Sequence, residues 1–102
     1  MTEYVNKTSA VVELDEPIKR GETEITRVTV RKPKSGELRG VRLQVLMEMD
    51  VISMTEVLPR ITDPSLTKPE IGAMTPGDLL NMSIEVVNFL LPKSMQADYR
   101  ND

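Results

Sequence analysis

The chain has 102 residues, of which 39% are apolar and only 3% aromatic, and its formal net charge is −3. This length corresponds to one domain, whose core must be built from Leu, Val, Ile and Met. Cysteine and histidine are both absent, which excludes disulfide-stapled folds, thiolate zinc sites and catalysis by a Cys or His side chain. The N-terminus lacks a signal-peptide pattern, and no apolar run approaches the roughly 18 residues of a membrane span, so we expect a cytosolic protein.

The first predicted element is an antiparallel pair of strands, residues 9–14 with residues 24–31. The run SAVVEL is rich in β-branched residues, and apolar and polar residues alternate from Val28 onward, which is typical of a strand with one buried face. Ile25 is out of phase with Val28. We therefore expect either a bulge or a strand start near Thr26.

The middle of the chain is ambiguous between strand and helix. Apolar residues in 41–49 alternate as a strand would. Yet one helical face would hold Leu38, Val41, Val45 and Met49, and good helix formers favour a helix over 37–48. A second helix begins after Asp50, a typical N-cap residue. Pro59 disfavours helical backbone at Leu58, so this helix is predicted to end or kink there.

The clearest element is the last helix. Thr67–Glu70 has the spacing of a capping box, which predicts a short helical turn before it. Thr75 then serves as N-cap, Pro76 occupies the first helical position, and the apolar run continues to Leu91. The predicted fold class is α+β, an N-terminal antiparallel two-stranded sheet followed by about three helices.

The predicted organisation is a flexible N-terminus over 1–8, a single domain over 9–91, and a polar, disordered tail over 92–102. A two-stranded sheet is marginal by itself, so it should pack on the helices or pair across a homo-oligomer.

Methionine is frequent, and on the last helix the apolar arc covers well over half of the circumference. Methionine suits both irregular core gaps and surfaces that accept varied partners. The two interpretations stay open, and the width of the arc favours a partner. The predicted apolar contact residues are Met54, Leu79, Met82, Val86 and Leu90.

Positive charge is concentrated in Pro17–Arg42, which holds eight of the thirteen Lys and Arg. This segment contains no aromatic residue for base stacking, and no helix-turn-helix or zinc pattern accompanies it. Two of the basic residues, Arg27 and Arg31, alternate with the valines, as on the solvated face of a strand. We therefore favour protein contact over nucleic-acid binding, through Arg27, Arg31, Lys32 and Arg39.

Nothing in the sequence indicates catalysis. The Ser and Thr residues have no His to activate them, and the segment SGELRG lacks both the spacing and the Lys-Ser/Thr ending of a phosphate-binding loop. We expect no catalytic residue, no metal site and no cofactor.

Three segments together resemble a protein family: PIKRGETEITRVTVRKPKSGELRGVRL, DVISMTEVLPRITDPSLT and MTPGDLLNMSIEVVNFL. Their order is similar to that in the small tail assembly chaperones of contractile-tailed phages of the P2 and Mu type. The resemblance covers roughly residues 9–91, and its strength lies in the order of the segments because no single motif is specific.

The resemblance implies a non-enzymatic protein that holds the aggregation-prone tape-measure protein until tube subunits polymerise around it. It also implies the tail tube protein as a second partner, the host bacterial cytoplasm as the location, and absence from the mature virion. Such genes often yield a longer product by ribosomal frameshifting. Two other functions stay open: a small basic-faced nucleic-acid-binding or regulatory module, and a structural subunit retained in the tail.

Overall fold

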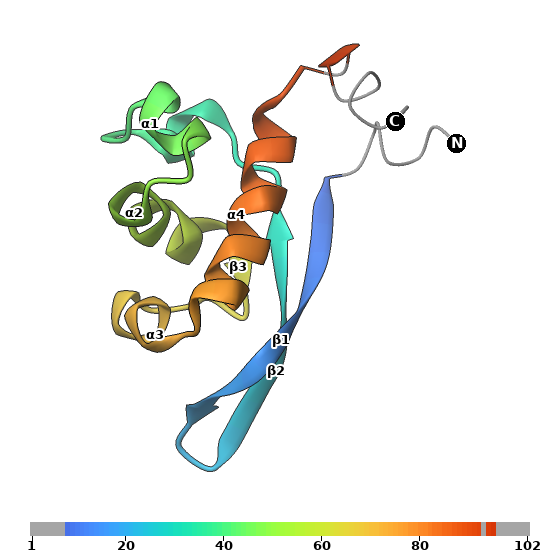
Figure 1. The fold of residues 1–102 in the computed structure, drawn as a ribbon, viewed down its shortest axis with the longest axis vertical. Coiled ribbons are helices and arrows are strands. Elements are labelled where there is room, and N and C mark those ends of the chain that lie inside the picture. Colours follow the sequence, from blue (N-terminus) through green and yellow to red (C-terminus); the bar gives the residue numbers. More distant parts are fainter. Residues whose placement is uncertain (1–7, 93, 96–102) are drawn as a thin grey trace.

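A computed structural model describes residues 8–92 and 94–95, which form a three-stranded antiparallel sheet, four α-helices and a 3-10 turn (Figure 1). The elements in chain order are β1 (Ser9–Arg20), β2 (Thr23–Arg31), the 3-10 turn η2 (Ser35–Leu38), α1 (Leu43–Met47), α2 (Val51–Ile61), β3 (Thr62–Asp63), α3 (Lys68–Ala73) and α4 (Pro76–Leu90). The predicted α+β class is confirmed. The predictions for the terminal segments fall largely outside the described residues.

The hairpin of β1 and β2 is longer than predicted. Residues 9–13 pair with residues 31–27, and residues 18–20 pair with residues 25–23, with a shift in register between Glu13 and Ile18. The shift therefore lies opposite Thr26, where the phase of Ile25 predicted a bulge or a strand start. The unpaired residues of this bulge belong to β1, between Glu13 and Ile18. The hairpin turns at Gly21, whose φ of +63° places it in the left-handed region that glycine adopts without strain.

A buried carboxylate holds the irregular part of β1. Asp78 lies in the first turn of α4 and is completely buried. Its Oδ1 accepts a hydrogen bond of 2.8 Å from the backbone N–H of Asp15, and its Oδ2 accepts one of 3.3 Å from that of Glu16. The N-terminus of α4 is thereby attached to the bulge, which satisfies two backbone donors that the register shift removes from the ladder.

The helices begin where the capping residues predicted. Asp50 accepts a bond from Ser53 N–H at 2.9 Å, Thr67 and Glu70 form the capping box, and Thr75 caps α4. The predicted helix over 37–48 is instead divided into η2 and α1, because Gly40 has a φ of +88° that a helix cannot contain.

An end or a kink was predicted at Leu58; an end there is wrong, because the helix continues through Pro59 to Ile61. The final carbonyls of α2 find other partners: the hydroxyl of Thr62 donates to the Leu58 carbonyl and that of Ser65 donates to the Pro59 carbonyl, both at 2.8 Å. The chain then forms β3, the strand that the sequence did not indicate, which pairs Thr62 with Val30 of β2.

All four helices lie on one side of the sheet, with α4 across the hairpin, while the turn between β1 and β2 projects beyond the helices (Figure 1). The sheet contributes alternate residues to the core, as its period of two requires. The core residues from the sheet are Ala10, Val12, Ile18, Ile25, Val28 and Val30; those from the helices and their connections are Leu38, Leu46, Met54, Val57, Leu58, Ile61, Leu66, Ile71, Met82, Val86 and Phe89.

Candidate partner-binding surfaces

Three of the five predicted apolar contact residues lie inside the domain. Met54, Met82 and Val86 are completely buried and belong to the core. A partner cannot touch them while the domain keeps this fold, so the alternative interpretation, that these residues fill a core short of aromatics, describes their place. Leu79 and Leu90 are partly buried and pack against the same core. Contact of a partner with these two leucines stays a prediction.

Other apolar side chains are exposed instead. Leu43 at the start of α1 is 57% exposed, and Val51 and Ile52 at the start of α2 are 60% and 75% exposed. We call Leu43, Val51 and Ile52 the α1–α2 apolar surface, because α1 and α2 are in contact. An exposed isoleucine on the water-facing side of an amphipathic helix has no role in the core, and groups of such residues often mark an interface.

The sequence contained a signal for part of this surface. Helical spacing aligns Val51 on one stripe with Met54, Leu58 and Ile61, yet Val51 is 60% exposed while the other three are buried. Ile52 lies off that stripe altogether. An apolar residue out of phase with the buried face was the observation that could have identified it.

Two of the predicted basic contact residues form ion pairs within the domain. The guanidinium of Arg31 bonds both carboxylate oxygens of Glu37 and also donates to the carbonyl of Arg60 at 3.0 Å. This hydrogen-bonded pair lowers the pKa of Glu37 to about 2, with further help from the Lys34 backbone N–H. Arg27 lies 3.5 Å from Glu13 in an exposed pair, which is weak in water.

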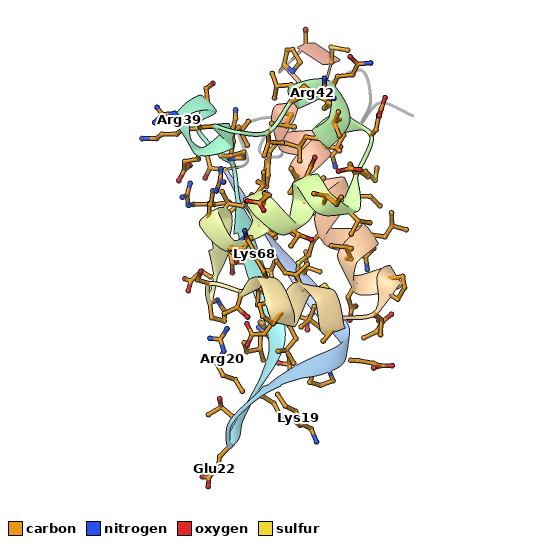
Figure 2. The ribbon with its side chains drawn as sticks, turned by 90° about the vertical axis from the view of Figure 1, so that its left-hand side faces the viewer. Lys19, Arg20, Glu22, Arg39, Arg42 and Lys68 are labelled. Carbon is orange, nitrogen blue, oxygen red and sulfur yellow. The ribbon has the colours of Figure 1, made fainter. Side chains whose placement is uncertain are left out.

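Lys32 and Arg39, the other two predicted basic residues, are exposed. Lys32 and Lys34 line a shallow hollow with Thr8 and Ser9 at the end of the hairpin that is remote from its turn. Figure 2 places Arg39 and Arg42 at the same end of the molecule, opposite Glu22 at the hairpin turn. Exposed positive charge therefore lies both near η2 and α1 and along β2, where Arg27 and Arg31 are also exposed. Contact of a partner with these basic residues stays a prediction.

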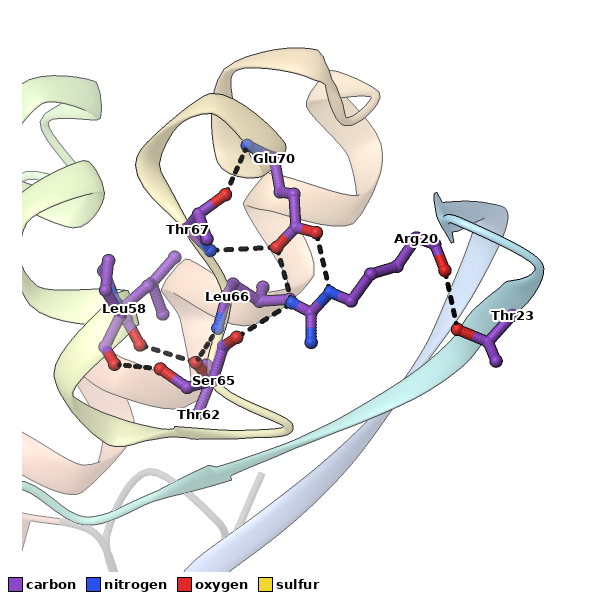
Figure 3. Close-up of polar contacts among 9 residues, drawn as sticks. Arg20, Thr23, Leu58, Thr62, Ser65, Leu66, Thr67 and Glu70 are labelled. Carbon is purple, nitrogen blue, oxygen red and sulfur yellow. Dashed lines mark hydrogen bonds and ion pairs between the residues drawn. The ribbon is translucent and has the colours of Figure 1, made fainter.

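Arg20 connects the projecting hairpin to α3 (Figure 3). Its guanidinium donates to both oxygens of Glu70 at 2.9 and 2.7 Å and to the Ser65 carbonyl at 2.9 Å. The Arg20 bond, followed by bonds from Thr67, lowers the pKa of Glu70 to about 2. Next to this bridge is an open cavity of about 270 Å³ between the hairpin and α3, lined in part by Pro17, Ile18 and Met74. The bridge attaches the end of β1 to the first turn of α3.

Residues 8–92 and 94–95 contain neither a metal-binding cluster nor a membrane-spanning helix. No group of three or more Asp or Glu residues in this part of the chain has the arrangement of a metal site. No helix within it is long and apolar enough to cross a membrane.

Comparison with known proteins identifies the family. Residues 11–91 match the family described as "Phage tail assembly chaperone proteins, E, or 41 or 14". The chain is 45% identical over 86 residues to "Tail assembly protein E" of Escherichia phage P2, covering 84% of this chain and 94% of that protein. It is 41% identical over 96 residues to "Tail assembly protein E'" of the same phage, covering 86% of this chain and 68% of that protein. No solved structure matches it.

The chain therefore belongs to the phage tail assembly chaperone family. The resemblance seen in the order of its segments is confirmed, and a role in assembling phage tails follows from the family.

Proposed function

We propose that this protein is a non-enzymatic chaperone that binds the tape-measure protein during tail assembly in the host bacterial cytoplasm and is absent from the mature virion. Membership of the tail assembly chaperone family is the observation that carries this proposal. The geometry supports it because the described residues combine a well-packed core with exposed apolar side chains on α1 and α2.

The α1–α2 apolar surface has the chemistry that such a partner requires. Before assembly, a tape measure exposes apolar stripes of long helices, and those stripes need a partner that covers them reversibly. Ile52 and its neighbours offer apolar area without the many fixed hydrogen bonds that would demand one partner sequence. The exposed basic residues at the same end of the molecule, such as Arg42, would attract acidic residues beside such a stripe and speed encounter. The tail tube protein is a second candidate partner for these charges.

The test is co-expression with the product of the long downstream reading frame, followed by affinity capture and light scattering. We expect a soluble complex with wild-type protein, and loss of that complex with Ile52→Asp, which should leave stability within about 0.5 kcal/mol because the side chain is exposed. Leu80→Asp on α4 is the matched control, since Leu80 is 51% exposed but lies on another helix. Absence of any complex with wild-type protein would refute the function. A complex lost only with Leu80→Asp would refute the surface.

A further inference from the structure

Within the described residues, no strand pairs with the outer edge of β1 along its first half. The strand order is β1-β2-β3, so β1 is an edge strand. The hydrogen bond of 2.7 Å from Lys32 N–H to the Thr8 carbonyl fixes the alternation of the ladder. In that register the even-numbered residues of β1 bond to β2, and the backbone groups of Val11 and Glu13 point away from it.

Helix α4 runs beside this edge and presents polar side chains to it. Near the start of α4, Asp78 bonds the outward N–H groups of Asp15 and Glu16, so the edge is closed at that end. One and two turns further along α4, the edge is open and borders a groove of about 300 Å³. The groove is lined by Val11, Val12, Glu13, Asn81, Ile84 and Glu85.

A carboxylate oxygen in this groove lacks a partner. Oε1 of Glu85 is buried and accepts no hydrogen bond from any described residue. A buried carboxylate oxygen without a donor costs free energy. Asp78, seven residues earlier on the same side of α4, makes the equivalent contact with the backbone of β1. Glu85 is thus positioned to accept a hydrogen bond from a strand that occupies the open edge.

We propose that the groove between β1 and α4 binds an extended segment of a partner protein that adds to the sheet as a strand and carries apolar and basic side chains. The outward backbone groups of Val11 and Glu13 would complete the ladder. On each face of the added strand one contact is apolar and one acidic: Val11 and Glu13 on one face, Ile84 and Glu85 on the other. This contact is separate from the α1–α2 apolar surface and does not depend on the proposed function.

Charge complementarity selects a different protein as the occupant over a second copy of this chain. Glu85 makes the groove acidic, and Glu13 adds to it because its pair with Arg27 is exposed and weak. The strand that a second copy would offer, residues 8–18, contains three acids and neither Lys nor Arg, so it would place acids beside acids. Like charges on adjacent strands are destabilising.

The test uses the whole purified protein and a synthetic peptide that repeats two valines and two lysines, so that each face of the extended peptide carries both residue types. Amide NMR and hydrogen exchange would follow the binding. We expect saturable binding with protection of the Val11 and Glu13 amides. A peptide with glutamate in place of lysine should bind at least tenfold more weakly.

Two variants locate the contact. Val11→Pro removes an N–H that faces the open edge and not β2, so it should abolish binding while the hairpin persists; Val11→Thr keeps the N–H and should bind as wild type. Glu85→Gln should weaken binding by about tenfold through loss of a charge-assisted bond, whereas Glu22→Gln at the hairpin turn should not. The proposal would be overturned if wild type did not bind the peptide at millimolar concentration. It would also be overturned if Val11→Pro and Glu85→Gln bound the peptide as tightly as wild type. Protection of the Val11 amide before peptide is added would also overturn it, because this chain would then cover its own edge.

Discussion

Asp78 provides the sharpest test of how the domain is held together, because one buried side chain attaches α4 to the bulge of β1. Asp78→Ala leaves the N–H groups of Asp15 and Glu16 without acceptors and removes a negative charge from the N-terminus of α4. Each unpaired donor costs about 1–3 kcal/mol, and the lost charge adds about 0.3–1 kcal/mol. Asp15 and Glu16 are exposed residues, so water partly replaces the lost acceptor. Together these effects should lower the free energy of unfolding by about 2–4 kcal/mol.

Urea denaturation followed by circular dichroism measures this loss, and the melting temperature should fall by about 10–25 °C. Hydrogen exchange adds the local readout, since the amides of Asp15 and Glu16 should both exchange faster. Asp78→Asn should keep the shorter bond to Asp15 and lose the longer one to Glu16, so its effect should be intermediate. Glu22→Ala, at the exposed hairpin turn, is the control and should stay within about 0.5 kcal/mol of wild type. A loss below about 1 kcal/mol for Asp78→Ala, with the Asp15 amide still protected, would refute the reasoning.

Two further predictions concern the hairpin bridge and the core. Because Arg20 depresses the pKa of Glu70 to about 2, the stability from this pair should be present above about pH 4.5 and lost as pH falls toward 2. The difference in urea midpoint between wild type and Arg20→Ala should therefore shrink over that range. A difference that stays constant with pH would contradict this prediction. Met82→Ala should lower the free energy of unfolding by about 2–5 kcal/mol because the side chain is fully buried. A loss below about 1 kcal/mol in urea denaturation would contradict the burial of Met82.

Some of this architecture was readable from the sequence because its causes are local. Asp50, Thr67 and Thr75 each satisfy N–H groups within three residues along the chain, so the helix starts were predictable without any knowledge of the fold. The alternation from Val28 in β2 likewise reports one buried face of a strand. The order of the three similar segments also identified the family, because comparing sequences needs no coordinates.

The tertiary structure decided which apolar residues are available to a partner. Met82 and Ile52 are both apolar residues of amphipathic helices, yet one is completely buried and the other 75% exposed, because burial depends on which distant elements pack over each turn. The same holds for Asp78, whose partners in β1 lie more than 60 residues away. A helix pattern specifies which face is apolar. Only the packing of the helices against the sheet and against one another determines where that apolar face is covered and where it stays open to a partner.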